Sequence, residues 1–164
     1  MHLPFRAVNR RGAPGHDPVL QRHHLIPRQA LRHAGLERMF ASLGKRRIGF
    51  DDFRRNGVLL PACDLTAVRT GLPLHPGPHR SYNDMVLDRL GTIEGNWSVC
   101  RSRRRTLADE TAVMRIALLQ QALRRRLLDE RVPLILNRHQ PLGAGQDFTL
   151  LDALAEELWT ACAA

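Results

Sequence analysis

Two prolines fix where the first extended segments of this 164-residue chain end. Proline cannot donate a hydrogen bond to a strand ladder, and its ring fixes φ. Pro27 follows the short, apolar-bounded run 19–26, and Pro61 follows residues 58–60, which come after an Asn-Gly turn signal. Short runs bounded in this way are typical of strands. The sequence therefore predicts two strands separated by an inserted segment.

The segments around these strands have different patterns. Residues 28–43 carry apolar side chains at three- and four-residue spacing, interrupted by Gly35, which predicts a helix in two pieces. Residues 63–78 are rich in glycine and proline, so we expect a loop there. Residues 1–20 have the same bias and are expected to form an irregular arm that becomes ordered only on binding.

The second half of the chain has helical patterns. Pro78 suits the first position of a helix that Gly91 can end. Capping patterns, in which a threonine is followed three residues later by an aspartate, begin a long helix over residues 106–131 and another at Thr149. The expected fold class is α+β, with two strands followed by helices.

Composition excludes several classes of protein. Hydrophobic residues make up 43% of the chain, which is enough for a packed core and too much for a charge-driven disordered chain. No run approaches the ~18 apolar residues that span a bilayer, and the first residues lack the apolar stretch of a secretory signal. The three cysteines are far apart, so neither a disulfide framework nor a thiolate metal site is expected.

The charge is positive and unevenly distributed. The 25 basic and 16 acidic residues give 25 − 16 = +9, and residues 22–55 hold nine basic residues against three acidic ones. The last eighteen residues hold four acids and no base. Because neutralised phosphates release counterions, such a basic region favours a nucleic-acid partner. The preference for arginine over lysine carries less weight, since a GC-rich genome produces it too. We interpret the triplet 124–126 as the solvent face of a helix.

Histidines are the residues with the clearest chemical pattern. His23 and His24 are adjacent; His75 and His79 stand four apart, with His79 in the first turn of a predicted helix and His75 on the loop before it. Neutral imidazoles can bind a metal ion and can accept a proton near pH 7. Since neighbouring side chains of a strand point to opposite faces, His23 and His24 are not expected to bind one ion together. Taken singly, each pattern also fits ordinary surface histidines.

Three blocks occur in a specific order: HHLIP at 23–27, NGVLLP at 56–61 and HPGPHRSYN at 75–83. In these blocks the sequence resembles the HNH/endonuclease VII superfamily, with its ββα-metal fold, and specifically the AHH nuclease family of bacterial toxin-type domains. The resemblance covers about residues 21–88. Arg22 stands in place of the alanine that names the family, and the longer spacing to the asparagine implies an insertion between the strands.

The resemblance implies a role for each member of these blocks. His23 and His79 would be metal ligands, with His75 as the third, holding one divalent ion: Zn, Ni, Mn or Mg. His24 would be the general base. Asn56 would complete the catalytic set, either as a further ligand or as a hydrogen-bonding clamp that holds the loop. Two or three imidazoles leave positions open for water and phosphate, as in a catalytic site.

Other residues flank this set. Arg22, Arg28 and Arg80 are candidates for binding the scissile or neighbouring phosphates. Tyr82 and Asn83 are expected either to pack or to support the ligands. The resemblance therefore divides the chain into three parts. They are an irregular arm over 1–20, an HNH/AHH-like nuclease core over 21–92 and a helical C-terminal extension over 93–164 that packs on the core.

The leading hypothesis is a metal-dependent endonuclease that hydrolyses phosphodiester bonds of DNA with low sequence specificity. Folds of this type enter the minor groove, where few base edges are distinctive. One alternative is a non-catalytic nucleic-acid-binding module with a structural zinc. Another is an RNase, or the toxin domain of a secreted bacterial effector, with an acidic immunity protein as partner. We expect a cytoplasmic protein, or, if it is a toxin, one secreted without a signal peptide. The expected partner is DNA or RNA, and no binding to a membrane is expected.

Overall fold

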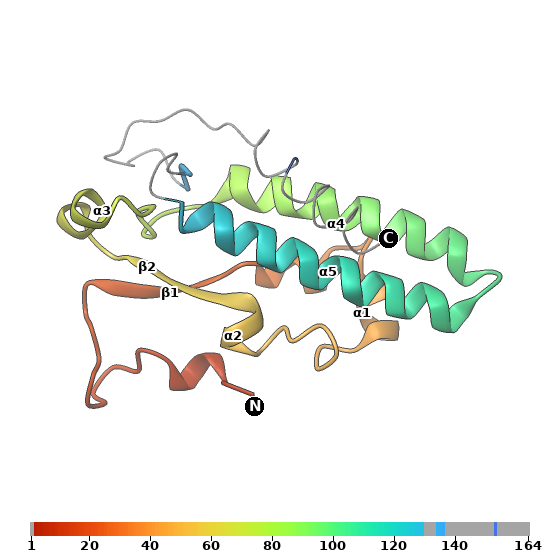
Figure 1. The fold of residues 1–164 in the computed structure, drawn as a ribbon, viewed down its shortest axis with the longest axis horizontal. Helices are drawn as coiled ribbons and strands as arrows, with labels where there is room; N and C mark the ends of the chain where they lie inside the picture. The colour runs from red at the N-terminus through yellow and green to blue at the C-terminus, as the bar shows by residue number, and fades with distance from the viewer. Residues whose placement is uncertain (1, 130–133, 137–152, 154–164) are drawn as a thin grey trace.

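The computed structural model describes residues 2–129, 134–136 and 153, and it has an α+β architecture (Figure 1). Strands β1 (Leu20–His24) and β2 (Gly57–Pro61) form a two-stranded antiparallel sheet. The other elements, in chain order, are η1 (Phe5–Ala7), η2 (Arg28–Arg32), α1 (Glu37–Leu43), α2 (Phe53–Asn56), α3 (Asp64–Thr70), α4 (Arg80–Arg101) and α5 (Arg105–Leu127). This order confirms the predicted strand, strand and helix arrangement.

The register of the sheet fixes the faces of β1. Leu20 pairs with Pro61 and His24 with Gly57, so the end of β1 meets the beginning of β2. Gly57 is required at this point, because a Cβ atom there would collide with the ring of Phe53. The Asn-Gly pair, predicted as a turn, instead joins the end of α2 to the beginning of β2.

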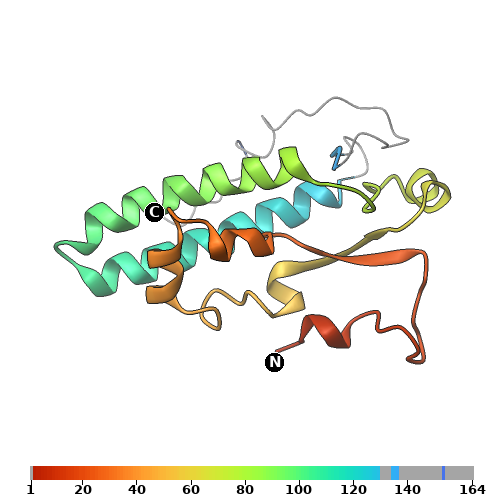
Figure 2. The ribbon, with the colours of Figure 1, turned by 180° about the vertical axis from the view of Figure 1, so that it is seen from behind.

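The inserted segment between the strands agrees with the predicted broken helix. Residues 28–43 form two pieces, η2 and α1, with Gly35 between them. The apolar side chains of α1, Met39, Phe40 and Leu43, are buried. Figure 2 shows this segment lying against the two long helices. The insertion therefore contributes to the core.

Helices α4 and α5 form an antiparallel pair that runs the length of the molecule (Figures 1 and 2). The prediction that Gly91 ends the first of these helices is wrong, since α4 continues to Arg101. Ile93 and Trp97 lie beyond the glycine and are almost fully buried. Burying these two side chains outweighs the ~1 kcal/mol that a glycine costs inside a helix.

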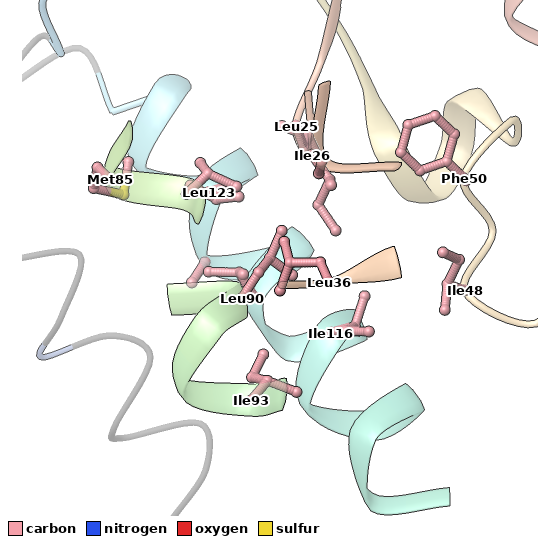
Figure 3. Close-up of a cluster of buried hydrophobic side chains, with 14 of the residues drawn as sticks. Leu25, Ile26, Leu36, Ile48, Phe50, Met85, Leu90, Ile93, Ile116 and Leu123 are labelled. Carbon is pink, nitrogen blue, oxygen red and sulfur yellow. The ribbon is translucent and has the colours of Figure 1, made fainter. Parts of the chain in front are cut away.

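One buried cluster joins the strands, the insertion and both long helices. Figure 3 shows side chains from each of these parts pointing toward one another. Leu25 and Ile26 enter it from the end of β1, Leu90 from α4 and Ile116 from α5. Residues of α5 therefore share a core with the strands that carry the histidine pair.

Two further predictions need correction. The segment 63–78 is not all loop, because residues 64–70 form α3, which ends where Gly71 takes a left-handed conformation. The triplet 124–126 is not one solvent face, since Arg126 is only 1% exposed; successive helical residues are rotated by about 100° and cannot share a face. Within the arm, Nδ2 of Asn9 donates to the carbonyl oxygens of Asp17 and Leu20, and its Oδ1 accepts from the Asp17 amide.

Two remaining predictions concern the C-terminal helix and membrane-spanning segments. The helix predicted from Thr149 lies outside the described residues, apart from residue 153. Within the described part of the chain, none of the helices is both long and apolar enough to cross a bilayer.

Replacing Leu90 with alanine is expected to lower the free energy of unfolding by roughly 2–5 kcal/mol, because this fully buried side chain leaves a cavity. The matched control is Val99→Ala on the same helix, where the side chain is 77% exposed and the expected change is below about 0.5 kcal/mol. Urea unfolding followed by circular dichroism measures both. Equal losses in the two variants would contradict the assignment of the buried face of α4.

Candidate metal centre and active site

Three histidines from separate parts of the chain converge. His23 lies on β1, His75 on the loop after α3, and His79 is the residue that precedes the first turn of α4. One nitrogen from each ring lies within 4.8 Å of the other two. The ring centroids are 5.3 Å apart for both pairs that include His23, and 4.9 Å apart for His75 and His79. This spacing is suitable for three imidazoles around one ion.

The hydrogen bonds of these rings leave one nitrogen on each for an ion. Nε2 of His23 and Nδ1 of His79 are buried and have no hydrogen-bond partner among the described residues. Nδ1 of His75 lies 2.7 Å from Oε1 of Gln21, which leaves its Nε2. The His79 ring also hydrogen-bonds to the backbone of Leu136. Metal-bound histidines usually use their second nitrogen in this way, so the residues fit a metal site.

The protonation of the three rings also suits metal binding. Burial, followed by the nearby His75 and His79, holds the pKa of His23 well below its usual value. Burial, and then His79 and His24, lowers the pKa of His75 to about 4. Burial lowers the pKa of His79 as well, against the opposing effect of its hydrogen bond to Leu136. All three imidazoles are therefore neutral near pH 7, with lone pairs available to a cation.

His24 does not belong to this cluster. It follows His23 on β1 and so points to the other face of the strand. Its ring stacks on Phe5, with the centroids 3.7 Å apart and the planes 4° from parallel. Burial lowers its pKa to about 4, with a further lowering by Arg28 and Arg22 and an opposing effect of Asp51. A neutral, half-buried imidazole of this kind can accept a proton at neutral pH.

The Asn56 side chain is fully buried and bound to the backbone of two loops. Its Oδ1 accepts from the Ile26 amide at 2.8 Å, and its Nδ2 donates to the carbonyl oxygens of Phe50 at 3.1 Å and Ile26 at 3.3 Å. Its backbone carbonyl accepts from the Leu25 amide at 2.8 Å. Gln120 of α5 donates to the same Oδ1 at 3.3 Å. These bonds hold the chain that leaves β1.

Tyr82 supports the same segment from α4. Its hydroxyl donates to the carbonyl of Leu25 at 2.7 Å, and its ring lies edge-on to His23 with the centroids 5.0 Å apart. Full burial raises the pKa of the hydroxyl, so it remains a donor. Of the two supporting residues suggested by the sequence, Tyr82 therefore contacts a candidate ligand directly.

The three candidate arginines lie on the surface around the histidines. Arg22, Arg28 and Arg80 are all exposed. Nη1 of Arg22 donates to the carbonyl of Phe5 at 2.8 Å. The charges of Arg22 and Arg28 act on His24, while Arg80 directly follows His79 in the chain. Arg22 and Arg28 therefore lie close enough to His24 to act on its charge, and Arg80 adjoins the candidate ligand His79 in the chain.

Four residues that contact the candidate site residues were not predicted from the sequence. Gln21 supports His75, Phe5 stacks on His24, Gln120 contacts Asn56, and Leu136 binds His79. Only Gln21 had a usable signal, because residues two apart on a strand share a face and it precedes His23 by two. The others come from segments far away in the sequence.

Replacing Asn56 with alanine is expected to lower the free energy of unfolding of the metal-free protein by at least about 2 kcal/mol. The change leaves the buried amide of Ile26 and the carbonyl of Phe50 without their partner, at roughly 1–3 kcal/mol each. Chemical unfolding in the presence of a chelator measures this. A variant with wild-type stability in chelator but weaker metal binding would show that Asn56 is a ligand instead.

The chain is similar to a known protein family. No curated protein and no solved structure matches the chain. A family model matches residues 4–123, which is most of the chain and includes most of the arm, the insertion, α4 and most of α5. The model describes a nuclease family of the HNH/ENDO VII superfamily with a conserved AHH, in which Arg22 here replaces the alanine before His23 and His24. The chain therefore belongs to the AHH nuclease family of the HNH/ENDO VII superfamily.

Proposed function

We propose that this chain is a metal-dependent endonuclease that hydrolyses phosphodiester bonds of DNA with little sequence preference, and that His24 is its general base. Membership of the family implies a nuclease acting on nucleic acid. The observation that carries the finer proposal is the separation of neighbouring histidines onto two faces of β1. One face meets two further imidazoles, and the other presents a single imidazole.

His23, His75 and His79 are the residues that would hold a divalent ion. When bound there, such an ion supplies positive charge to the phosphate oxygens and to the leaving group. Among the described residues the cluster offers three imidazoles. Three protein ligands are typical of catalytic sites, which keep a position open, whereas structural zinc sites use four. This count favours the nuclease over the alternative of a binding module with a structural zinc.

His24 is placed to move the proton. Its pKa of about 4 keeps the ring neutral in solution at pH 7, and its half-buried position leaves it accessible. A ring nitrogen can then remove a proton from the attacking water. Because His24 is absent from the three-histidine cluster, this proton transfer does not require a ligand to leave the ion.

The arginines bind and orient the substrate in this proposal. Arg22, Arg28 and Arg80 are exposed near the histidines, and their guanidinium groups can bind phosphate oxygens in a bidentate manner. Asn56 acts as the clamp, since its amide group is engaged by backbone groups. Contacts to phosphates carry no sequence information, which supports low specificity.

The role of the nuclease in the cell is a separate proposal. The family resemblance suggests a toxin-type domain neutralised by an acidic immunity protein, and the net charge of +9 would attract such a partner.

Replacing His24 with alanine is expected to reduce plasmid nicking about 10²–10⁴-fold, the usual contribution of a general base, while leaving metal binding within about twofold of the wild type. Gel assays in Mg²⁺, Mn²⁺, Ni²⁺ and Zn²⁺, each with and without chelator, measure cleavage. His16→Ala is the control, since His16 lies on the arm and outside both the cluster and the stack.

Two outcomes would contradict this proposal. If the wild type nicks plasmid with none of these ions, the protein is not the proposed DNA endonuclease. If His24→Ala cleaves as the wild type does, the base lies elsewhere. Parallel assays on RNA decide between the two nucleic acids.

A further inference from the structure

A wide groove runs beside η2 and α1. Its volume is about 1020 Å³, at the upper end of the range for pockets that bind single small molecules. The charged side chains at its walls are mostly basic, and its apolar side chains come from η2, α1 and α4. The residues that matter here are Arg28, Arg32, Glu37, Phe40, Lys45 and Leu87.

One wall residue of the groove, Arg28, follows His24 by four positions in the chain. Arg28 is both a wall residue and a cation whose charge acts on His24. Arg28 is also the first residue of η2, which follows directly from the end of β1. Arg32 lies at the end of η2, and Lys45 lies beyond the end of α1. The cations therefore lead away from His24 along the inserted segment.

The balance of charge in the groove favours a polyanion. Among the described residues that line the groove, Arg28, Arg32 and Lys45 are exposed cations, and Glu37 is the one acid. Exposed cations at separate points of one groove can each contact a different phosphate of a nucleic-acid backbone. A small anion would instead need donors gathered at one point.

We propose that this groove is the path of the nucleic-acid strand on one side of the cleavage point, with Arg32 and Lys45 binding phosphates beyond the scissile one. The proposal rests on the proposed function, since it takes His24 to mark the cleavage point. It extends the binding surface from the first three arginines to the inserted segment between the strands. Affinity for longer substrates then depends on residues that take no part in the chemistry.

The test compares two double variants that remove the same charge. Arg32→Ala/Lys45→Ala removes the two groove cations, and Arg103→Ala/Arg104→Ala removes two exposed cations at the junction of α4 and α5. Fluorescence anisotropy of a short labelled DNA duplex, with chelator present, gives Kd without cleavage. The groove variant is expected to bind about tenfold more weakly, and the slope of log Kd against log salt falls by about 2.

Several outcomes would overturn this inference. Kd and salt slope that do not change in the groove variant would exclude the groove as the path. An equal loss in the control variant would show that only net charge matters. A different outcome separates the two proposals. If the groove variant binds DNA more weakly than the wild type but the wild type never cleaves DNA, the groove is still the binding path and the proposed function fails.

A second, independent observation concerns the arm. Phe5 stacks face to face on His24, and the ring of Phe53 meets Phe5 edge-on with the centroids 5.1 Å apart. The Phe5 carbonyl accepts from Arg22 on β1. The stack is therefore fixed to the sheet by a hydrogen bond and to α2 by an aromatic contact.

Leu3 and Pro4, the two residues before Phe5, are also bound to the region around α2. Leu3 exchanges hydrogen bonds with the neighbourhood of α2: its amide donates to Oδ1 of Asp52 at 3.1 Å, and its carbonyl accepts from the Phe53 amide at 2.7 Å. Pro4 forms an isolated bridge with Asp52. The arm is thus held at the positions immediately before the stacking residue.

We infer that Phe5 is a positioning residue that sets the plane of the His24 ring. A parallel stack covers one face of an imidazole and leaves both ring nitrogens, which lie in the ring plane, free for water and substrate. The contact fixes orientation without competing for the proton. A correctly oriented base matters because displacement by about 1 Å can cost a factor of about 10² in rate.

The test uses Phe5→Leu, with Phe5→Tyr as the conservative variant. Phe5→Leu is expected to lower kcat about 10–100-fold with KM and metal binding little changed. Phe5→Tyr, which keeps an aromatic ring, is expected to retain most of the wild-type kcat. In a His24→Ala background, Phe5→Leu should cause no further loss. Since stacking shifts the ring protons of His24, NMR of the labelled histidine should show that shift in the wild type and lose it in Phe5→Leu.

Results of two kinds would contradict the role of Phe5. One is wild-type kcat in Phe5→Leu, and the other is an equal loss in the wild-type and His24→Ala backgrounds. The NMR shift does not depend on cleavage, so its absence in the wild type would refute the stack even if the protein proved inactive.

Discussion

The hydrogen bonds of Asn56 to the chain leaving β1 are the constraint on which the site depends. They fix the amides of Leu25 and Ile26, so β1 ends at His24 with a defined orientation. Tyr82 binds the Leu25 carbonyl from α4, and Gln120 reaches Asn56 from α5. A buried polar network of this kind is costly when broken, because each group loses its partner away from water. The two long helices therefore help to hold the histidine pair.

The fixed strand divides the chemistry between its faces. On one side, the imidazole of His23 joins those of His75 and His79, which arrive on a loop and at the beginning of α4. On the other, His24 contacts the arm through Phe5. Two residues that are adjacent in sequence thus have different surroundings, and no movement of either is needed for both roles. The proposal that one holds an ion while the other accepts a proton follows from this arrangement.

Local patterns predicted the two strands and the broken helix, because prolines, turn residues and short apolar runs act through near neighbours. The same patterns failed where distant packing decides. Gly91 is inside a helix because Ile93 and Trp97 are buried against other elements. Arg126 is buried in spite of its charge. These outcomes depend on which surfaces meet, which a single sequence does not state.

The residues of the candidate site show the same difference between local patterns and distant contacts. The histidines could be selected from their spacing and from the family resemblance. Their supports could not, because Phe5, Gln21 and Gln120 act through contacts across the fold. Asn56 is an intermediate case: the sequence left a ligand and a clamp open, and its hydrogen bonds are those of a clamp.

The most direct test of the central claim is a crystal structure of the protein with a divalent transition metal, using anomalous scattering to locate the ion. The account predicts one ion per chain, bound by Nε2 of His23, Nε2 of His75 and Nδ1 of His79, with His24 unligated and Asn56 still bound to the backbone. An ion that includes His24 or Asn56 among its ligands, or that lies away from the three histidines, would contradict it.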